Sequence, residues 1–293
     1  MSRTSSKVHL INLYKWRSIV ASIACFITIV LSLGSVAYGI LTDTSLESVR
    51  AEFEWFTVDS NLLTAFAALM VFPYAVDGIK KKMLVYPKWV LLIHYAGTIC
   101  ITLTMVFTLF VIRWYDPQLA FGDERIYLHV ICPLAVLISF FMVESDYSID
   151  KSDTFLGMIP FALYSFVYFY FVVIAKSWED HYKLNTFVPF YVSIPIMYIL
   201  AYIIACAIRY VQNSLLKYRE KKLKAIWDED LSPVEIKIEI YSLGIHAGLH
   251  QNKQSVSIPY GILEEVTNKF GIKIEELVQA YAKGVIDGFK EKC

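Results

Sequence analysis

Six apolar segments constrain the fold of this chain more than any other feature of its sequence. Each is close to the ~20 residues that an α-helix needs to cross a hydrocarbon core of ~30 Å. They are predicted at residues 18–41, 61–79, 89–113, 127–143, 154–176 and 187–210. The first exceeds the ~7–15 apolar residues of a secretory signal, so we expect it to be a span. The sequence therefore predicts an all-α polytopic membrane protein with six transmembrane helices.

Charged residues gather at the C-terminal end of the chain. Only 18% of the 293 residues are charged, against about a quarter in soluble domains. Residues 211–293 hold 24 of the 54 charges. We therefore expect a cytosolic segment at 1–17, a six-helix transmembrane domain at 18–210 and a small helical cytosolic tail at 211–293. The net charge of +0 argues against a nucleic-acid partner, because the chain offers no broad basic face.

Lysine and arginine are unevenly divided between the two sides of the predicted membrane domain. The N-terminal segment, the second and fourth loops and the stretch after the last span carry 15 of them, and the other side carries 5. Such an excess marks the cytoplasmic side of a membrane. We therefore expect both termini in the cytoplasm, in a pattern that suits a bacterial plasma membrane.

The tail is predicted to be a small bundle of helices. Ser232, Pro233 and Glu235 are typical of a helix start, with Ser232 as the N-cap. A second helix is expected to start at 257–259 and to end near Gly271. A third is predicted from about 274 to 290, where apolar residues recur at helical spacing. The tail contains no catalytic motif, and its partner stays unknown at this stage.

Polar residues form a stripe at the start of the second span. Thr57, Ser60, Asn61 and Thr64 fall on one face of a helix. Asp59 points elsewhere, and a helix N-cap is its favoured interpretation. The stripe has two interpretations of equal weight: small polar residues commonly join membrane helices, and polar groups inside a membrane are also candidates for function.

His129 stands at the start of the fourth span. The second and fourth spans enter the membrane from the same side, so Thr57 and His129 are predicted to lie at similar depth. A hydroxyl and an imidazole at one level can act as nucleophile and general base. Spacing alone favours the alternative, an interfacial histidine that caps a helix or bonds a neighbour.

Three other ionisable residues share the opposite level. His94, Asp77 and Glu144 are candidates for an inner polar cluster of the kind that proton-linked transporters use. The favoured interpretation is that both carboxylates lie at the interface. The chain lacks metal-binding and phosphate-binding motifs, so we expect no cofactor and no metal.

Two short segments carry a resemblance to a known family. Residues 56–61 (Phe-Thr-Val-Asp-Ser-Asn) and 128–133 (Leu-His-Val-Ile-Cys-Pro), set in six spans, resemble the androgen-induced-gene and androgen-dependent TFPI-regulating protein family of six-span membrane lipid hydrolases. A related group of uncharacterised bacterial six-span membrane proteins is more similar still. The likeness covers about residues 15–210. The animal family has a second histidine three residues before the one in span 4, where this chain has Ile126.

The resemblance implies an esterase that acts on fatty acid esters of hydroxy fatty acids. In this chain it makes Thr57 the nucleophile and His129 its base, with Ser60, Asn61 or a backbone N–H as candidates to stabilise the oxyanion. Membrane lipids are the expected partners and a lipid ester the expected substrate.

Tyrosines of the last span widen the set of candidate substrate-binding residues, because Tyr191 and Tyr198 lie at helical spacing and are able to line an amphipathic channel. Packing with satisfied hydroxyls is the alternative. The candidates for substrate binding are Asp59, Ser60, Asn61, Tyr191 and Tyr198. A small-solute or lipid transporter and a non-catalytic anchor whose tail binds a partner remain alternative functions.

Overall fold

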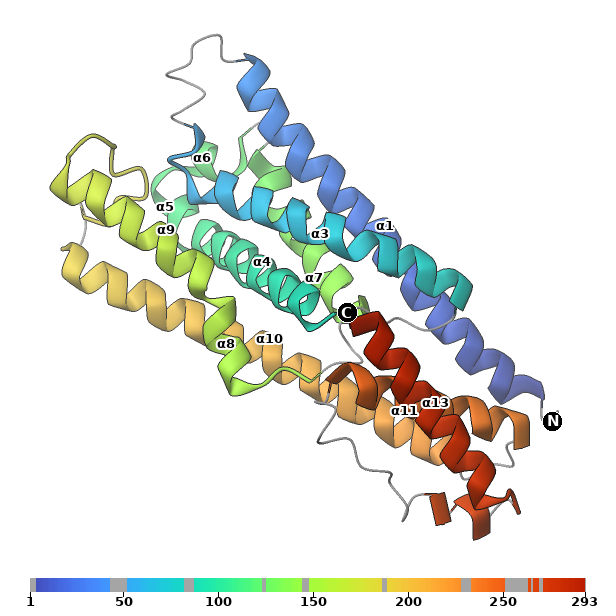
Figure 1. Ribbon diagram of the computed structural model, residues 1–293. Helices are drawn as coiled ribbons and strands as arrows, with labels where there is room; N and C mark the ends of the chain where they lie inside the picture. The colour runs from blue at the N-terminus through green and yellow to red at the C-terminus, as the bar shows by residue number, and fades with distance from the viewer. Residues whose placement is uncertain are drawn as a thin grey trace. The chain divides into compact units, whose positions relative to one another are not determined.

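The protein is mainly helical in the part of the chain that the structure describes. The structure, a computed structural model, describes residues 4–42, 52–81, 87–122, 125–143, 148–185, 189–227, 233–250, 263–264, 266–268 and 271–292. Every regular element within these ranges is a helix (Figure 1). The prediction of an all-α fold is therefore confirmed for the described residues.

Five helical stretches in these ranges are long and apolar enough to cross a membrane. They are Trp16–Tyr38, Phe56–Ile79, Lys88–Tyr115, Lys151–Ile174 and Phe190–Tyr218. A sixth apolar helix, Tyr127–Met142, is shorter. These helices fit an integral membrane protein, and each corresponds to one of the predicted segments.

The chain divides into two compact units. The first, the membrane unit, consists of Met1–Val85 and Trp89–Lys217, and the second, the tail unit, of Tyr86–Lys88 and Tyr218–Cys293. Helix α10 (Phe190–Trp227) belongs to the membrane unit up to Lys217.

Helix α4 (Lys88–Phe107) forms the core of the membrane unit. In its most apolar stretch 72% of the residues are buried, against 22–39% in the other four spanning helices. Small and polar residues of α4 meet its neighbours closely. Gly97 lies against the backbone of Thr64, and the Tyr95 hydroxyl donates to the Ala205 carbonyl at 2.7 Å. Close approach at small residues is how membrane helices commonly associate.

Helices α1 (Thr4–Thr42), α3 (Phe56–Lys81) and α7 (Cys132–Val143) pack against one another beside this core. The start of α3 corrects one prediction. The helix begins at Phe56, and the Trp55 carbonyl accepts the N–H groups of Val58 and Asp59. Asp59 therefore lies in the first turn of the helix and not at the N-cap. A negative charge in the first turn still interacts favourably with the positive end of the helix dipole.

Within the described residues, three π-helical turns lie at one end of the membrane unit. They are η1 (Thr108–Ile112), which continues α4, η2 (Tyr127–Ile131), which precedes α7, and η4 (Tyr170–Ile174), which follows α8 (Lys151–Gly157) and α9 (Ile159–Phe169). We call this the His129 end, because η2 contains His129. The opposite end is the His94 end. π-Turns in helices are rare and frequently mark functional sites.

A short helical connection joins η1 to η2. It contains α5 (Arg113–Tyr115) and α6 (Pro117–Phe121). Pro117 starts α6. The carboxylate of Asp116 caps this helix by accepting the Leu119 N–H at 2.8 Å, and proline is favoured at the first helical position because it lacks an N–H.

The tail unit contains two helices that lie side by side, α11 (Pro233–His250) and α13 (Ile274–Lys292), drawn in orange-brown and red in Figure 1. A Cβ atom at Gly244 or Gly284 would meet the backbone of the facing helix, so glycine permits the close approach. The predicted starts at Pro233 and Ile274 agree with the structure. The predicted caps at Ser232 and 257–259 lie outside the described residues.

Candidate active site

Thr57 and His129 contact each other at the His129 end. Thr57 Oγ1 lies 3.3 Å from His129 Nε2. The two side chains are only 6% and 5% exposed. Thr57 is the second residue of α3 and His129 the third residue of η2. The two side chains therefore lie together, as the shared depth of the two segments predicts.

The second ring nitrogen fixes the orientation of the imidazole. His129 Nδ1 lies 2.7 Å from the Ala120 carbonyl oxygen in α6. A carbonyl can only accept, so the neutral ring carries its proton on Nδ1. Nε2 is then an acceptor facing the Thr57 hydroxyl, which is the geometry of a general base beside a nucleophile.

The rest of the polar stripe on α3 is engaged in hydrogen bonds. Asn61 Nδ2 donates to the Thr57 carbonyl at 2.8 Å, and Ser60 Oγ lies 3.1 Å from that same oxygen. Ser60 Oγ also lies 3.1 Å from Thr104 Oγ1 of α4. Thr64 Oγ1 donates to the Ser60 carbonyl and, at 3.4 Å, approaches the Gly97 carbonyl. Ser60 and Thr64 thus join α3 to α4, whereas Thr57 faces a histidine.

An apolar cavity opens on one side of Thr57. Its walls come mainly from α4, η1, α9 and α10, and the empty space between its lining atoms is about 520 Å³. This figure includes space that is open to solvent. The side chains around it include Phe56, Leu103, Ile194 and Met197. The cavity therefore suits an aliphatic chain.

A second, more polar cavity lies on the other side of Thr57. Arg125, Glu52, Trp55 and His129 are among its lining residues. The Arg125 side chain is exposed, and its charge acts on the imidazole of His129. Thr57 lines both cavities. The hydroxyl therefore lies where an apolar chain and a polar group would meet.

Two more side chains reach both cavities, Ile112 of η1 and the buried Tyr182 of the connection between η4 and α10. The Tyr182 hydroxyl accepts the Thr57 N–H at 3.3 Å. Burial raises the pKa of Tyr182 to about 12, and the nearby Asp59 charge adds to the rise. The phenol therefore keeps its proton at neutral pH.

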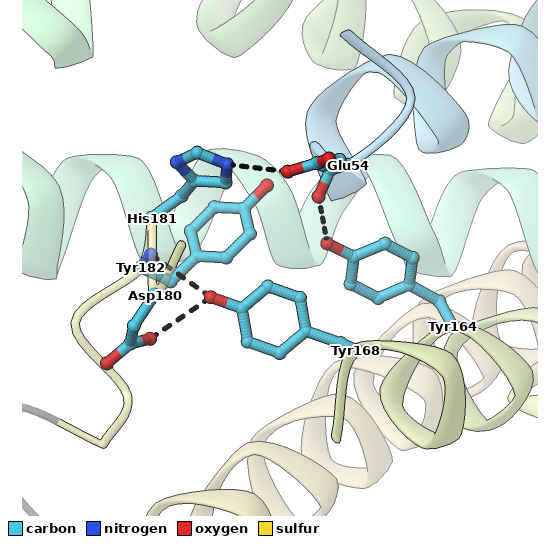
Figure 2. Close-up of polar contacts among 6 residues, drawn as sticks. All are labelled: Glu54, Tyr164, Tyr168, Asp180, His181 and Tyr182. Carbon is cyan, nitrogen blue, oxygen red and sulfur yellow. Dashed lines mark hydrogen bonds and ion pairs between the residues drawn. The ribbon is translucent and has the colours of Figure 1, made fainter. Parts of the chain in front are cut away.

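Polar contacts hold this connection against the start of α3 (Figure 2). His181 Nε2 lies 3.2 Å from a carboxylate oxygen of Glu54, and the Tyr164 hydroxyl donates to the Glu54 carbonyl at 2.7 Å. The His181 ring stacks on Trp55 at a centroid distance of 4.2 Å. The neighbouring Tyr182 is thereby fixed beside Thr57.

Asp180 organises the same connection from within. One carboxylate oxygen accepts the Tyr168 hydroxyl at 3.0 Å, as Figure 2 shows, and the Leu184 N–H at 2.9 Å. The other oxygen accepts the Asn185 N–H at 2.8 Å. Lys183 follows Tyr182 in the left-handed region with φ of 54°. Non-glycine residues in that region are uncommon and often occur near functional sites.

The other predicted substrate-binding residues are scattered. Asp59 is half-buried near Tyr182. Tyr198 bonds Ser165, a residue of the apolar cavity, at 2.6 Å between the oxygens. Tyr191 is 79% exposed and lines neither cavity. The structure therefore brings Asp59 and Tyr198 near the cavities and leaves Tyr191 outside them.

The predicted inner cluster is described only in part. His94 Nε2 lies 3.2 Å from Ser139 Oγ, and Ser139 Oγ donates to the Val136 carbonyl at 2.9 Å. Glu144, the third member with Asp77, lies outside the described residues. Within the described part of the chain, no group of three His, Cys, Asp or Glu side chains is able to hold a metal ion.

Apolar helices of spanning length, with a buried hydroxyl and imidazole in contact, place this chain in the class of helical membrane proteins that carry a candidate active site. Comparison with protein-family models, curated proteins and solved structures gives no match to the chain. The function of the chain is therefore inferred from the residues of the site.

Sequence reasoning misses the residues around the pair. Tyr182, Arg125 and the carbonyl of Ala120 belong to connections between spans, where helical periodicity carries no signal. The one available signal is the run Trp178-Glu-Asp-His-Tyr182, which concentrates aromatic and ionisable groups in a short segment. Such residues on a connecting segment commonly serve binding or catalysis.

Proposed function

We propose that this protein is an intramembrane hydrolase of lipid esters, with Thr57 as the nucleophile and His129 as the general base. The observation that carries the proposal is the contact of 3.3 Å between Thr57 Oγ1 and a ring nitrogen whose partner nitrogen bonds a carbonyl. The resemblance to the androgen-induced-gene family supports the same two residues.

The reaction proceeds through an acyl-enzyme. Thr57 Oγ1 attacks the ester carbonyl while His129 Nε2 takes the hydroxyl proton. The tetrahedral intermediate expels the alcohol, which leaves with that proton from the imidazolium. Water then attacks the acyl-threonine with His129 again as the base, which releases the fatty acid and restores the threonine. A threonine hydroxyl is a weak nucleophile alone, so the adjacent base is essential.

The two cavities suit the two ends of such a substrate. The apolar cavity accommodates an acyl chain, whose transfer from water is favourable by ~0.8 kcal/mol for each buried CH₂. The cavity with Arg125 accommodates the polar alcohol portion and admits water. The ester bond then lies at Thr57, which lines both.

The proposal includes the topology. Tyr127–Met142 acts as a sixth span, because it is apolar and its polar end at His129 is closed by α6. Both termini lie in the cytoplasm, an orientation supported by the excess of Lys and Arg on that side. The Thr57–His129 pair then lies near the outer surface, where a lipid ester enters from the outer leaflet.

Turnover of fatty acyl esters by the purified protein in detergent tests the proposal. Thr57→Ala should lower kcat/KM by about 100-fold or more, because it removes the nucleophile. Thr64→Ala is the matched control on the same helix, since Thr64 lines neither cavity, and it should stay within a few-fold of the wild type. Equal activity of Thr57→Ala and the wild type would contradict the proposal.

A further inference from the structure

The hydroxyl of Tyr182 accepts a hydrogen bond from the backbone N–H of Thr57. Tyr182 Oη lies 3.3 Å from the Thr57 nitrogen. That N–H belongs to the first turn of α3, where N–H groups have no acceptor inside their own helix. A second donor and the positive end of a helix thus lie at the proposed nucleophile.

We propose that Tyr182 is the oxyanion donor of the ester hydrolase: its oxygen accepts the Thr57 N–H, and its own proton is donated to the carbonyl oxygen of the substrate in the transition state. This inference rests on the proposed function. Because Tyr182 Oη accepts the Thr57 N–H at 3.3 Å, its own proton is left to be donated, and an oxyanion site requires such a donor at ~2.7–3.1 Å from the oxygen.

The step to which Tyr182 contributes is the formation of the tetrahedral intermediate. The new bond joins Thr57 Oγ1 to the carbonyl carbon, and the hydroxyl proton passes to His129 Nε2. The electron pair of the C=O double bond moves to oxygen, and Tyr182 donates its O–H to that charge without giving up the proton. Collapse of the intermediate restores the carbonyl and weakens the hydrogen bond again.

The side chains that the sequence offers for this role are committed elsewhere. Asn61 Nδ2 and Ser60 Oγ both bond the Thr57 carbonyl, which points along α3 away from its first N–H groups. In contrast, Tyr182 lines both cavities beside Thr57. Its hydroxyl therefore lies beside the proposed nucleophile, where the ester carbonyl would bind.

The surroundings of Tyr182 are built to hold it still. Its ring meets Trp55 edge-on at 5.6 Å and Phe107 at 5.9 Å between centroids. Its own N–H approaches the Tyr168 hydroxyl at 3.4 Å. The left-handed Lys183 turns the chain directly after it. Groups that stabilise a transition state work best when they are fixed beforehand, because no reorganisation is then needed during the reaction.

The test compares Tyr182→Phe with the wild type by steady-state kinetics and inhibitor binding. Loss of one oxyanion donor lowers kcat by about 100- to 1,000-fold. A trifluoromethyl ketone with an acyl tail forms a tetrahedral oxyanion adduct on Thr57, and its Ki should rise in parallel with the loss of kcat/KM. A non-hydrolysable ether of the same length makes no oxyanion, and its affinity should stay unchanged.

Tyr95→Phe is the matched control. It removes a buried tyrosine hydroxyl that donates to the Ala205 carbonyl at the His94 end, so it reports the cost of losing such a bond without touching the site. Its kinetics should match the wild type. If Tyr182→Phe retains wild-type kcat, or weakens ketone and ether equally, Tyr182 is not the oxyanion donor, even though Thr57→Ala is inactive. Activity of Thr57→Ala would instead overturn the proposed function itself.

Should Tyr182→Phe fail to fold, 3,5-difluorotyrosine at position 182 keeps the ring and the hydroxyl but ionises at lower pH. The proposal then predicts that kcat falls as pH rises through the pKa of the fluorinated phenol, because its anion has no proton to donate. An unchanged pH profile would overturn it.

Discussion

At each end of the membrane unit a described histidine contacts a hydroxyl, and the two contacts differ in which partner donates the proton. At the His129 end, Nδ1 bonds a carbonyl and Nε2 accepts from Thr57. At the His94 end, Ser139 gives its own proton to the Val136 carbonyl, so His94 Nε2 must donate to the serine. A serine that accepts a hydrogen bond is not activated as a nucleophile, whereas a threonine that donates to a base is.

The surroundings of the two pairs differ in the same sense. Phe140 lies edge-on to the His94 ring at 5.3 Å, and neither His94 nor Ser139 lines the two cavities at Thr57. The His129 end has π-helical turns and cavities. Similar side chains thus stabilise the fold at one end and form a candidate active site at the other. Burial of a histidine in a membrane helix therefore does not identify function by itself.

Substitution of the two histidines should give the largest difference. His129→Asn keeps a group able to donate to the Ala120 carbonyl but removes the base, so turnover should fall by about 100- to 10,000-fold. His94→Gln should keep near-wild-type turnover and lower thermal stability, because it disturbs a buried hydrogen bond worth roughly 1–3 kcal/mol. Kinetics and melting in detergent measure both. A larger loss of turnover in His94→Gln would reverse the comparison.

Filling the apolar cavity should have the next largest effect. Ile194→Trp places a large ring where the acyl chain is proposed to bind, and kcat/KM for long-chain esters should fall by about tenfold or more. Ile196→Trp, on the same helix but 54% exposed, is its control. A short acetyl ester should be much less affected by Ile194→Trp. Equal effects on long and short esters would argue against acyl binding in this cavity.

Alanine substitutions at Gly157 and Gly97 test how tightly the side chains around α4 are packed. A Cβ at Gly157 would lie 2.7–2.9 Å from Ile99 and the Tyr95 ring, but one at Gly97 would make ordinary contacts of 3.4 Å or more. Gly157→Ala should therefore destabilise the protein by about 1–3 kcal/mol. Gly97→Ala should be close to neutral. Melting temperatures in one detergent measure both, and equal stability of the two variants would show that the His94 end has room to adjust.

The smallest effect is expected from a threonine of the apolar cavity. Thr108 is fully buried, and its hydroxyl has no hydrogen-bond partner among the described residues. Thr108→Val has nearly the same shape, so it should stabilise the protein by up to about 1 kcal/mol. Thr98→Val, near His94, should destabilise it, because Thr98 donates to the His94 carbonyl at 2.7 Å. Stability lost in both variants would mean that the Thr108 hydroxyl is bonded after all.

Much of the fold follows from apolar length, and the described spans match the predicted segments to within a few residues at most ends. Two ends differ more: the last span continues to Tyr218 instead of residue 210, and α3 starts five residues early, at Phe56. Polar residues of the first turn lower the local hydropathy, yet their hydrogen bonds to Trp55 and α4 extend the helix. The fourth predicted span, 127–143, corresponds to the apolar helix Tyr127–Met142, which is shorter than the five helices of spanning length.

The candidate site is predictable only where two helices supply it. Thr57 and His129 each lie at the start of an apolar helix, and the predicted topology places both at one level. Ala120 and Tyr182 belong to connections whose path depends on caps such as Asp116 and Asp180. Backbone carbonyls and tyrosines in connections have no periodic pattern in the sequence. Their roles are seen only in the interatomic distances of the structure.

Identification of the reacting atom tests the central claim most directly. The purified protein would be incubated with an alkyl fluorophosphonate, digested and analysed by peptide mass spectrometry. We predict one phosphonylated residue, Thr57, with labelling abolished in His129→Asn and retained in His94→Gln. An adduct on Ser139 or another hydroxyl, or no adduct in folded protein that hydrolyses esters, would contradict the assignment of Thr57 as the nucleophile.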